Sequence, residues 1–473
     1  MKKMNIPVGV SDFEEIRKNG YYYIDKSGLV RELLSRTGTK VTLITRPRRF
    51  GKTLGMSMLE SFFDIRKDSR ALFEGLEISE NQALCDAWMN QYPTIFVSFR
   101  QVDGLNFTGA YDMLTWVISE LYKEHRYLLD SDRIGTSDKE IAKQLEWGQA
   151  SMKDMKGSLM LLTRMMQRHY GKPIILLIDE YDVPVAKANN NGYYNEMLDV
   201  MKGLMQALKD NPALRFAVVT GCLKIAKESI FTGTNNFVSD TITNSRLNEY
   251  FGFVQSEVDE LLKAADVTEQ AENMKKWYDG YHFGDFDVYC PWDVINYVEQ
   301  LRYDPEAVPQ DFWSNSSGNA MVRRFIDMAD VSTKNEIERL IAGESIEKDV
   351  TPELTYDELD KSIENLWSVL FTTGYLTHKG RTESGKYRLV IPNREVRNLF
   401  VKKIREWFSD VSRKDGQTLE QLCDAFVNKN VEKIEQIFGD YLWNTISIRD
   451  TAVAKEKKEN FYHGILLGLL GYK

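Results

Sequence analysis

Cysteine is scarce in this chain of 473 residues, and no cysteine stands close to another. The four thiols, Cys85, Cys222, Cys290 and Cys423, form no C-x-x-C pair, and no histidine lies at zinc-finger spacing from them. The pattern therefore indicates neither a zinc module nor a disulfide framework. We expect reduced thiols in the protein core, as in a reducing compartment.

Long hydrophobic runs are also missing. The first residues, Met1 to Pro7, lack the apolar stretch of a signal peptide, and no run of about 18 uncharged apolar residues occurs anywhere. We therefore expect a cytoplasmic protein that is neither exported nor membrane-spanning.

An excess of positive charge is the third absence. Asp and Glu outnumber Lys and Arg by 70 to 61, which gives a net charge of -9, so a contact with DNA or RNA would need a local basic patch. Hydrophobic residues at 43% and charged residues at 28% are typical of a globular protein. The length predicts about three or four folding units.

The first half of the chain alternates short apolar runs with helical patterns. The run Val41 to Thr45 follows a helical segment, Leu29 to Ser35, and leads through a Pro/Arg/Gly stretch to a second helix, Leu54 to Phe63. Three more apolar runs lack alternation, as strands buried on both faces do, and helical patterns separate them: Thr94 to Phe99, Ile174 to Ile178 and Phe216 to Thr220, with helices at Gly109 to Leu121 and Met152 to Met166. This order predicts an α/β fold, a parallel sheet covered by helices.

A basic, glycine-containing loop joins the first strand to its helix. The P-loop pattern G-x-x-x-x-G-K-[ST] wraps phosphates in backbone amides, with Lys on the β and γ oxygens and the hydroxyl on Mg²⁺. Here Gly51, Lys52 and Thr53 fit the pattern, while Arg46 replaces its leading glycine. The position between a strand and a helix amino end favours a nucleotide site over a basic surface turn.

We predict that the residues of this phosphate loop, Arg46 to Thr53, bind ATP together with the residue that follows. The full set is Arg46, Pro47, Arg48, Arg49, Phe50, Gly51, Lys52, Thr53 and Leu54. The three arginines offer forks for phosphate oxygens or an acidic partner, and a solvated basic loop is the alternative for each.

A second apolar strand ends in two acids. Burial of Asp179 and Glu180 after Ile174 to Ile178 would be costly unless they serve a cation or a water molecule, as in a Walker B strand. We predict that Asp179 shares the Mg²⁺ shell with Thr53 and that Glu180 polarises the attacking water. Asp182 is expected to be an ordinary acid at a helix amino end.

The next apolar run ends in Thr220, followed by Gly221. ATPases of this layout often place a γ-phosphate sensor there, and we predict that role for Thr220. An ordinary strand-end turn is the alternative. Lys52, Glu180 and Thr220 are the predicted catalytic residues.

The second half carries fewer strand signals. Amphipathic segments at Gln255 to Lys263 and Pro291 to Leu301 precede a helix at Tyr356 to Leu370. A predicted hairpin then pairs Tyr375 to His378 with Tyr387 to Ile391, and the helix Arg394 to Phe408 follows. This order fits a winged-helix module, and it also fits many small α+β units.

Motifs spread along the chain resemble a bacterial AAA-ATPase-like family. The resemblance rests on these segments: Tyr22 to Ser27, Arg46 to Thr53, Leu177 to Asp182, Ser229 to Phe231, Asn235 and Asn236, Phe251 to Phe253, Trp277 to Tyr281, Tyr289 to Trp292, Trp313 to Asn319 and Ile391 to Asn393. It departs from the family where Lys224 stands in place of a common arginine, which removes a bidentate phosphate contact. No role follows from the residues for Asp25 and Lys26.

Members of that family typically join the ATPase to a PD-(D/E)XK nuclease-like domain. Glu459 to Gly464 resembles the first helix of that domain, and the family's metal-binding residues would lie beyond Lys473. The string Glu456-Lys457-Lys458 stands in a charged helical stretch rather than on a strand, so we do not interpret it as that centre. The expected division is an ATPase domain (1–250), a helical lid or linker (251–330), a helical, winged-helix-like domain (331–445) and the start of the nuclease-like region (446–473).

Two functions follow from these patterns. The first is an ATPase that uses Mg²⁺ and acts as a switch or motor for an attached effector domain. The second is a nucleotide-regulated module that binds DNA or a partner protein through its carboxy-terminal half. The turn between Lys379 and Lys386, with Arg381, carries the charge for such a contact, although a solvated hairpin tip explains it equally.

Overall fold

A computed structural model of the chain describes residues 4–36, 38–224, 237–313, 320–351, 361–414 and 424–445, with the single positions 354, 358 and 421. The chain divides into two compact units. The first comprises residues 1–272, 282–307 and 351–361, and the second comprises 273–281, 308–350 and 362–473. The four-part division predicted from the sequence stays a prediction.

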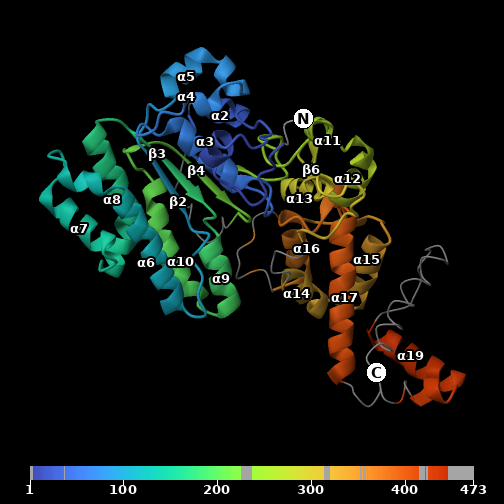
Figure 1. Cartoon of the computed structure of the whole chain (residues 1–473). Helices are drawn as coiled ribbons and strands as arrows, with labels where there is room; N and C mark the ends of the chain where they lie inside the picture. The colour runs from blue at the N-terminus through green and yellow to red at the C-terminus, as the bar shows by residue number, and fades with distance from the viewer. Residues whose placement is uncertain are drawn as a thin grey trace. The chain divides into compact units, whose positions relative to one another are not determined.

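A five-stranded parallel sheet forms the centre of the first unit (Figure 1). Its spatial order is β2-β3-β4-β1-β5, with β1 (Val41–Thr45), β2 (Thr94–Ser98), β3 (Ile174–Asp179), β4 (Leu214–Gly221) and β5 (Phe237–Asp240). The predicted α/β class is confirmed, and four of the strands lie where the apolar runs indicated. No sequence pattern indicated β5, which has only four residues, three of them half-buried.

The register brings the carboxyl ends of the strands to one edge of the sheet. Thr45 pairs with Gly221 across β1 and β4, and Ser98 pairs with Asp179 across β2 and β3. β4 lies between β1 and β3, so the loop after β1 and the acids after β3 are separated by one strand. Polar residues at these strand ends therefore share a common edge.

Helices cover both faces of the sheet, as Figure 1 shows. On one face lie α1 (Phe13–Lys18), α2 (Gly28–Leu34), α3 (Lys52–Phe63), α4 (Arg70–Phe73) and α5 (Gln82–Trp88), with the 3₁₀ turn η1 (Glu77–Glu80). On the other lie α6 (Phe107–Glu124), α8 (Met152–Tyr170) and α10 (Tyr194–Leu204), joined to η2 (Arg126–Asp130), α7 (Thr136–Glu146), α9 (Val183–Asn191) and η3 (Met205–Leu208). Because helices cover both faces of the sheet, the strands are buried on both sides, and their sequences are therefore continuous apolar runs.

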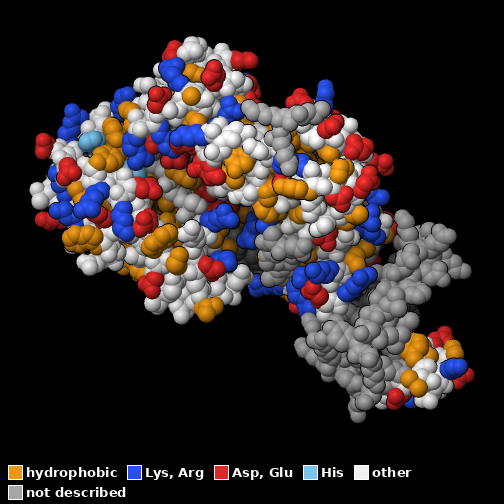
Figure 2. All heavy atoms as spheres, viewed as in Figure 1, with side chains coloured by type: hydrophobic (Ala, Val, Ile, Leu, Met, Phe, Trp, Pro, Cys, Tyr) orange, Lys and Arg blue, Asp and Glu red, His pale blue; other side chains and the backbone are white. Residues whose placement is uncertain are grey.

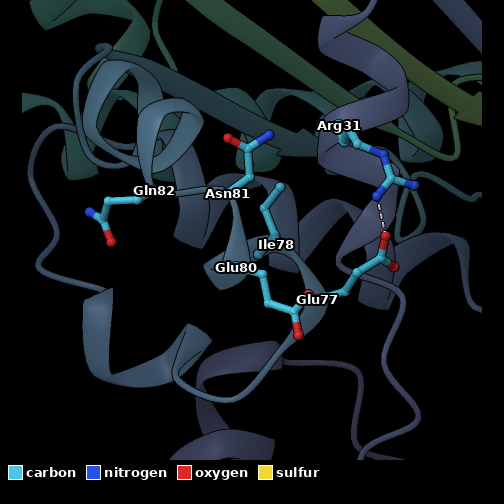
Figure 3. Close-up of a pocket in the computed structure, with 6 residues that line it drawn as sticks. All are labelled: Arg31, Glu77, Ile78, Glu80, Asn81 and Gln82. Carbon is cyan, nitrogen blue, oxygen red and sulfur yellow. Dashed lines mark hydrogen bonds and ion pairs between the residues drawn. The ribbon is translucent and has the colours of Figure 1, made fainter.

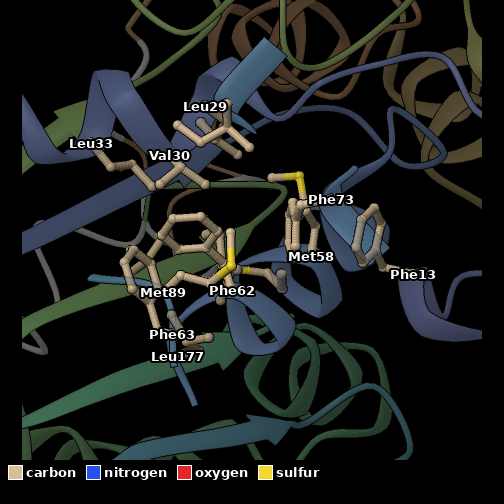
Figure 4. Packing of buried hydrophobic residues seen from close by; sticks show 14 of the residues in the cluster. Phe13, Leu29, Val30, Leu33, Met58, Phe62, Phe63, Phe73, Met89 and Leu177 are labelled. Atoms are coloured by element: carbon tan, nitrogen blue, oxygen red, sulfur yellow. The ribbon is translucent and has the colours of Figure 1, made fainter. Parts of the chain in front are cut away.

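The core beneath α3 holds this helix, and with it the loop that precedes it, against the sheet. Ile175 and Leu177 of β3 point toward α3, because alternate residues of a strand face the same side. Phe62 and Phe63 are fully buried and meet edge to face with ring centroids 5.2 Å apart. Figure 4 shows these rings packed among Met58, Phe73, Met89, Leu29, Val30, Leu33 and Phe13.

The first unit continues beyond the sheet through α11 (Gln255–Ala265), η4 (Thr268–Gln270), β7 (Phe286–Val288) and α13 (Pro291–Leu301), and α12 (Ala271–Tyr278) and β6 (Tyr281–Phe283) span the change of unit. The second unit contains α14 (Ala320–Met328), α15 (Val331–Ile341), β8 (Ile346–Lys348), α16 (Ile363–Thr372), β9 (Thr377–Arg381), β10 (Tyr387–Val390), α17 (Arg394–Lys414) and α19 (Val431–Thr445). Within the described residues, no helix is long and apolar enough to cross a bilayer.

The predicted hairpin is present in the second unit. β9 and β10 pair antiparallel, and β8, which the sequence did not reveal because it has only three residues, pairs with the other side of β10. The order of this sheet is β8-β10-β9. The winged-helix interpretation stays a prediction, and residues 446–473, where the nuclease-like region was expected to begin, lie outside the described residues.

Candidate nucleotide site

The predicted phosphate loop turns sharply from β1 into α3. Arg49 and Gly51 both have left-handed backbone, with φ of +72° and +83°. Gly51 is the N-cap of α3, and this conformation is easy only for glycine. The helix begins at Lys52, two residues before the predicted Leu54, because the apolar pattern could not register Lys52 and Thr53 as helical. The free amides of the first turn of α3 therefore lie directly after the loop.

Arg46, at the place of the leading glycine, is buried in the protein rather than extended from the loop. Its Nη1 donates to the carbonyl oxygens of Thr45 and Asp240, both at 2.8 Å. Its Nη2 donates to Asn248 Oδ1 at 2.8 Å. The guanidinium also lies over the Phe251 ring, 5.4 Å from its centroid. Burial lowers the pKa of Arg46 to about 10, against the opposing effect of Asp240.

The Arg46 side chain thus bonds to β5 and to the segment around residue 248. These hydrogen bonds hold the start of the loop in place. The remaining predicted ATP ligands have different surroundings. Pro47 and Phe50 are buried, Arg48 is exposed, and Arg49, Gly51, Thr53 and Leu54 are half-buried.

The neighbours of the loop come from the segment before and within α13. The Arg49 guanidinium lies 4.1 Å from the centroid of the Trp292 ring, and the Phe50 ring lies 5.1 Å from that of Phe283. The Leu54 side chain packs on the core beneath α3. Arg48 is therefore the arginine of the loop whose side chain is most open to solvent.

Lys52 is almost fully buried, and its ammonium points back into the loop. Nζ donates to the carbonyl oxygens of Arg46 and Pro47, both at 3.1 Å, and lies 3.6 Å from Glu180 Oε1. Burial alone would lower the pKa of Lys52, but the surrounding anionic groups, Glu180 and Asp179 among them, hold it above its ordinary value. The side chain is charged and held at the loop.

Cys222 also accepts from Lys52 Nζ at 3.6 Å. Burial raises the pKa of this thiol to about 12, so the sulfur is uncharged at neutral pH. The charge balance of Lys52 therefore rests on the carboxylates rather than on Cys222.

Asp179 is the point where four segments of the sheet edge meet. Its Oδ2 accepts from the Thr53 hydroxyl at 2.9 Å and from the Ser98 hydroxyl at 3.2 Å, and its Oδ1 accepts from the Thr220 hydroxyl at 2.6 Å. Burial, followed by the charge of Glu180, raises the pKa of Asp179, and the Thr220 and Thr53 hydrogen bonds oppose that rise. The structure therefore brings Thr53, Asp179 and Thr220 together, as well as Ser98, which no sequence motif had indicated.

Glu180 follows directly and turns toward Lys52. Its backbone is left-handed, with φ of +52°, which is uncommon for a residue with a side chain. Its side chain retains 14% exposure, against 2% for that of Lys52. A strained backbone conformation of this kind persists only where surrounding contacts enforce it, and such residues often lie at functional sites.

The two residues after Glu180 clamp the chain that leaves β4. Asp182 Oδ2 accepts from the backbone amides of Cys222 and Leu223, both at 3.0 Å, and the Tyr181 hydroxyl donates to the Leu223 carbonyl at 2.7 Å. Gly221 must be small, because a Cβ there would lie 2.6 Å from the Tyr181 ring. Asp182 was expected to be an ordinary acid at a helix amino end, and it is the N-cap residue of α9, although its side chain makes no capping hydrogen bond. The side chain is buried and instead positions the segment after Thr220.

Asp25 and Lys26, which had no assigned role, have structural contacts. The two carboxylate oxygens of Asp25 accept from the Ser27 and Glu77 amides at 2.8 and 2.6 Å. Lys26 Nζ donates to Glu257 in α11 at 2.6 Å and to the Glu249 carbonyl at 2.6 Å. These contacts tie the segment before α2 to η1 and to α11.

The donor set at Asp179 suits a cation bound mainly through its substrate. Among the described residues no cluster of three or more His, Cys, Asp or Glu side chains is arranged to hold a metal ion. Mg²⁺ in phosphate-binding sites is held by one or two carboxylate or hydroxyl oxygens together with water and phosphate oxygens. A hydroxyl and a carboxylate 2.9 Å apart, as in Thr53 and Asp179, fit that requirement.

A surface pocket of about 420 Å³ lies elsewhere, between α2, η1 and α5. Figure 3 shows its lining residues, Arg31, Glu77, Ile78, Glu80, Asn81 and Gln82, with the Arg31 guanidinium bonded to Glu77. None of them belongs to the predicted site, and the depression is open and strongly polar. The chemistry of the phosphate loop is therefore not connected with this pocket.

The fold and the strand-edge cluster define a parallel α/β protein in which a basic loop leads from the first strand into a helix. A family model described as Predicted AAA-ATPase matches residues 7–231, so this segment of the chain is similar to the AAA-ATPase-like family. The chain is also similar to an uncharacterized protein in the vnfD 5' region of Azotobacter chroococcum mcd 1, at 26% identity over 403 residues, which are 84% of this chain and 69% of the relative. The family indicates nucleotide binding in general terms.

Proposed function

We propose that the first unit binds ATP with Mg²⁺ at the phosphate loop and hydrolyses it. The observation that carries this proposal is the contact between Thr53 and Asp179, 2.9 Å apart, beside the buried ammonium of Lys52. The Thr53 hydroxyl follows β1 and the Asp179 carboxylate ends β3, two strands away in the sheet. The two groups meet next to the buried ammonium of Lys52. This arrangement suits the triphosphate of ATP and its metal ion better than a neutral ligand.

Binding would rest on groups that are already in place. The amides at the start of α3 face the loop, and Lys52 is held over it by the carbonyl groups of Arg46 and Pro47. Thr53 and Asp179 would hold Mg²⁺, and its positive charge would stabilise the negatively charged phosphate oxygens of ATP. Preorganised charges of this kind cost little reorganisation when the substrate arrives.

Glu180 is the group proposed to act on water. In hydrolysis the water oxygen forms a bond to the γ phosphorus, the bond to the bridging oxygen of ADP breaks, and a proton leaves the water. Glu180 stands one residue after Asp179, keeps part of its side chain open to solvent and lies 3.6 Å from Lys52 Nζ. Glu180 would orient the water and accept its proton. Thr220 would act as the γ-phosphate sensor through its hydrogen bond to Asp179.

The proposal extends to a switch or motor acting on an attached effector domain. The Tyr181 and Asp182 clamp supports a route for such coupling, because it fixes the chain after β4 to the residues that follow Glu180. The alternative is a nucleotide-regulated binding module with little hydrolysis.

ATP turnover and ATP affinity separate these functions. Lys52→Ala should abolish ATP binding, since it removes the cation at the phosphates, whereas Glu180→Gln should bind ATP normally and turn it over at least about a hundred-fold more slowly. A matched control is Lys123→Ala, which changes an exposed lysine on α6 paired with Glu120. Equal ATP affinity in the wild type and Lys52→Ala would refute the site. Wild-type binding without turnover would favour the binding module.

A further inference from the structure

In the second unit, the solvent face of α17 between residues 394 and 406 is composed of cations. In the part of this helix whose side chains are described, residues 394–406, the exposed residues are Arg394, Arg397, Lys402 and Arg405. At 100° per residue these four fall within an arc of about 140°, and they extend along about 16 Å of helix. No exposed acidic or apolar residue interrupts this cationic face.

Within the residues that the structure describes, no acidic neighbour pairs with these four cations. None of them has a carboxylate oxygen within 4.0 Å in the described part of the chain. The acids of the same stretch are used otherwise, since Glu395 is buried and accepts from the Trp313 amide, and Glu406 pairs with Lys403 at 2.6 Å. Figure 2 shows Lys and Arg side chains gathered where α17 runs in Figure 1.

Two of the four side chains are held in place. The Arg394 guanidinium lies over the Trp277 ring, 4.8 Å from its centroid, and Arg397 Nε donates to the Ile341 carbonyl at 2.6 Å. A side chain that is already ordered loses less conformational freedom on binding. The cationic face is therefore partly preorganised.

The hairpin, which the sequence indicated as a contact surface, also carries exposed cations, but the exposed Glu383 lies in its turn among them. Arg381 packs on the Tyr387 ring, 4.2 Å from its centroid, and Lys386 lies 3.9 Å from Asp349. α16, the helix before the hairpin, has no Lys or Arg, and residues 366–371 are buried. On α17, in contrast, all the exposed residues between positions 394 and 406 are cations.

A membrane surface suits this face poorly. Helices that bind bilayers insert an apolar side into the lipid. The apolar side of α17 is already covered by protein, because Val396, Leu399 and Phe400 are at most 1% exposed. Each strand of a duplex carries one phosphate per about 3.4 Å of duplex axis, so about 16 Å of axis spans about five phosphates of one strand.

We propose that the cationic face of α17 binds the phosphate backbone of a nucleic acid without reading its sequence. This binding does not depend on the proposed ATPase activity. Each cation would neutralise a phosphate and release counterions, so the affinity should fall steeply with salt.

The test measures binding of the full chain to a fluorescein-labelled 20-base-pair duplex by anisotropy across a salt series. Lys402→Gln with Arg405→Gln should weaken binding about ten-fold or more at low salt and should reduce the logarithmic salt slope by about 2. The control, Lys143→Gln with Lys153→Gln, removes two exposed lysines of α7 and α8 in the first unit. Both variants change the net charge from -9 to -11, and the control should bind like the wild type.

Three parallel measurements use single-stranded RNA, phosphatidylserine vesicles and polyglutamate. RNA binding lost in the α17 variant would support the proposal, since the backbone chemistry is shared. Equal weakening of nucleic-acid binding in both double variants would contradict the proposal. So would a wild-type protein that binds neither the duplex nor the RNA. Binding of vesicles or polyglutamate as tightly as the duplex would also contradict it. Thermal melts of both variants would establish that each is folded.

Discussion

Asp182 provides a test in which a buried charge should lower stability. Its side chain is buried, and burial, followed by the charge of Glu180, raises its pKa to about 6 from an ordinary value near 3.8. The folded-state pKa lies above the unfolded one, so the penalty is absent below about pH 4 and fully present above about pH 6. At about 1.4 kcal/mol per pH unit, the difference amounts to at most about 3 kcal/mol.

Asp182→Asn would remove the charge and keep a carbonyl oxygen for the Cys222 and Leu223 amides. We expect the variant to be more stable than the wild type at pH 8, by about 1 to 3 kcal/mol, with the gain shrinking toward pH 4. Calorimetric melts at pH 8, 6 and 4 measure this difference.

A control with the opposite sign is Asp138→Asn, because Asp138 pairs with Arg164 and Arg168, both at 2.7 Å. It should destabilise the protein by about 1 kcal/mol, since these partners are partly exposed. A variant Asp182→Asn that is less stable than the wild type at pH 8, with no change toward pH 4, would refute the assignment of a buried charge there.

Three further changes address the frame of the site. Arg46→Met should cost about 3 kcal/mol or more in unfolding free energy, because four acceptors lose a donor, and Arg46→Lys should cost less. Calorimetry showing no loss of stability for Arg46→Met would contradict the role of Arg46 in holding the start of the loop. Gly51→Ala should cost about 1 to 2 kcal/mol from its left-handed backbone and should weaken ATP binding further, so an unchanged melting temperature in denaturation would argue against this geometry. Asp25→Ala should cost about 1 to 2 kcal/mol by leaving two amides without acceptors, with KM for ATP unchanged, and a raised KM would instead place Asp25 at the site.

The sequence predicted the sheet and the edge where the candidate site lies for a physical reason. β1 and β3 are buried on both faces and therefore consist of continuous apolar residues, which mark their ends clearly. Because parallel strands end at one edge, Thr53, Asp179 and Thr220 could be expected together. In the structure, the hydroxyls of Thr53 and Thr220 each donate a hydrogen bond to Asp179. Their roles with ATP stay predictions.

Other features depend on contacts that no local pattern records. Whether Arg46 faces a phosphate or the protein interior is decided by Asp240 and Asn248, which are about two hundred residues away. The Asp182 clamp requires the amides after β4, and amides carry no sequence signal. β5 and β8 are too short to show periodicity.

The central claim, that Thr53 and Asp179 jointly serve a metal ion bound with ATP, is tested most directly by calorimetric titration of ATP with Mg²⁺ and with EDTA. Thr53→Val keeps the shape of the side chain and removes the hydroxyl that lies 2.9 Å from Asp179. We predict that this variant loses most of the affinity that Mg²⁺ adds in the wild type, while its affinity in EDTA changes little. An undiminished Mg²⁺ effect in Thr53→Val would contradict the claim.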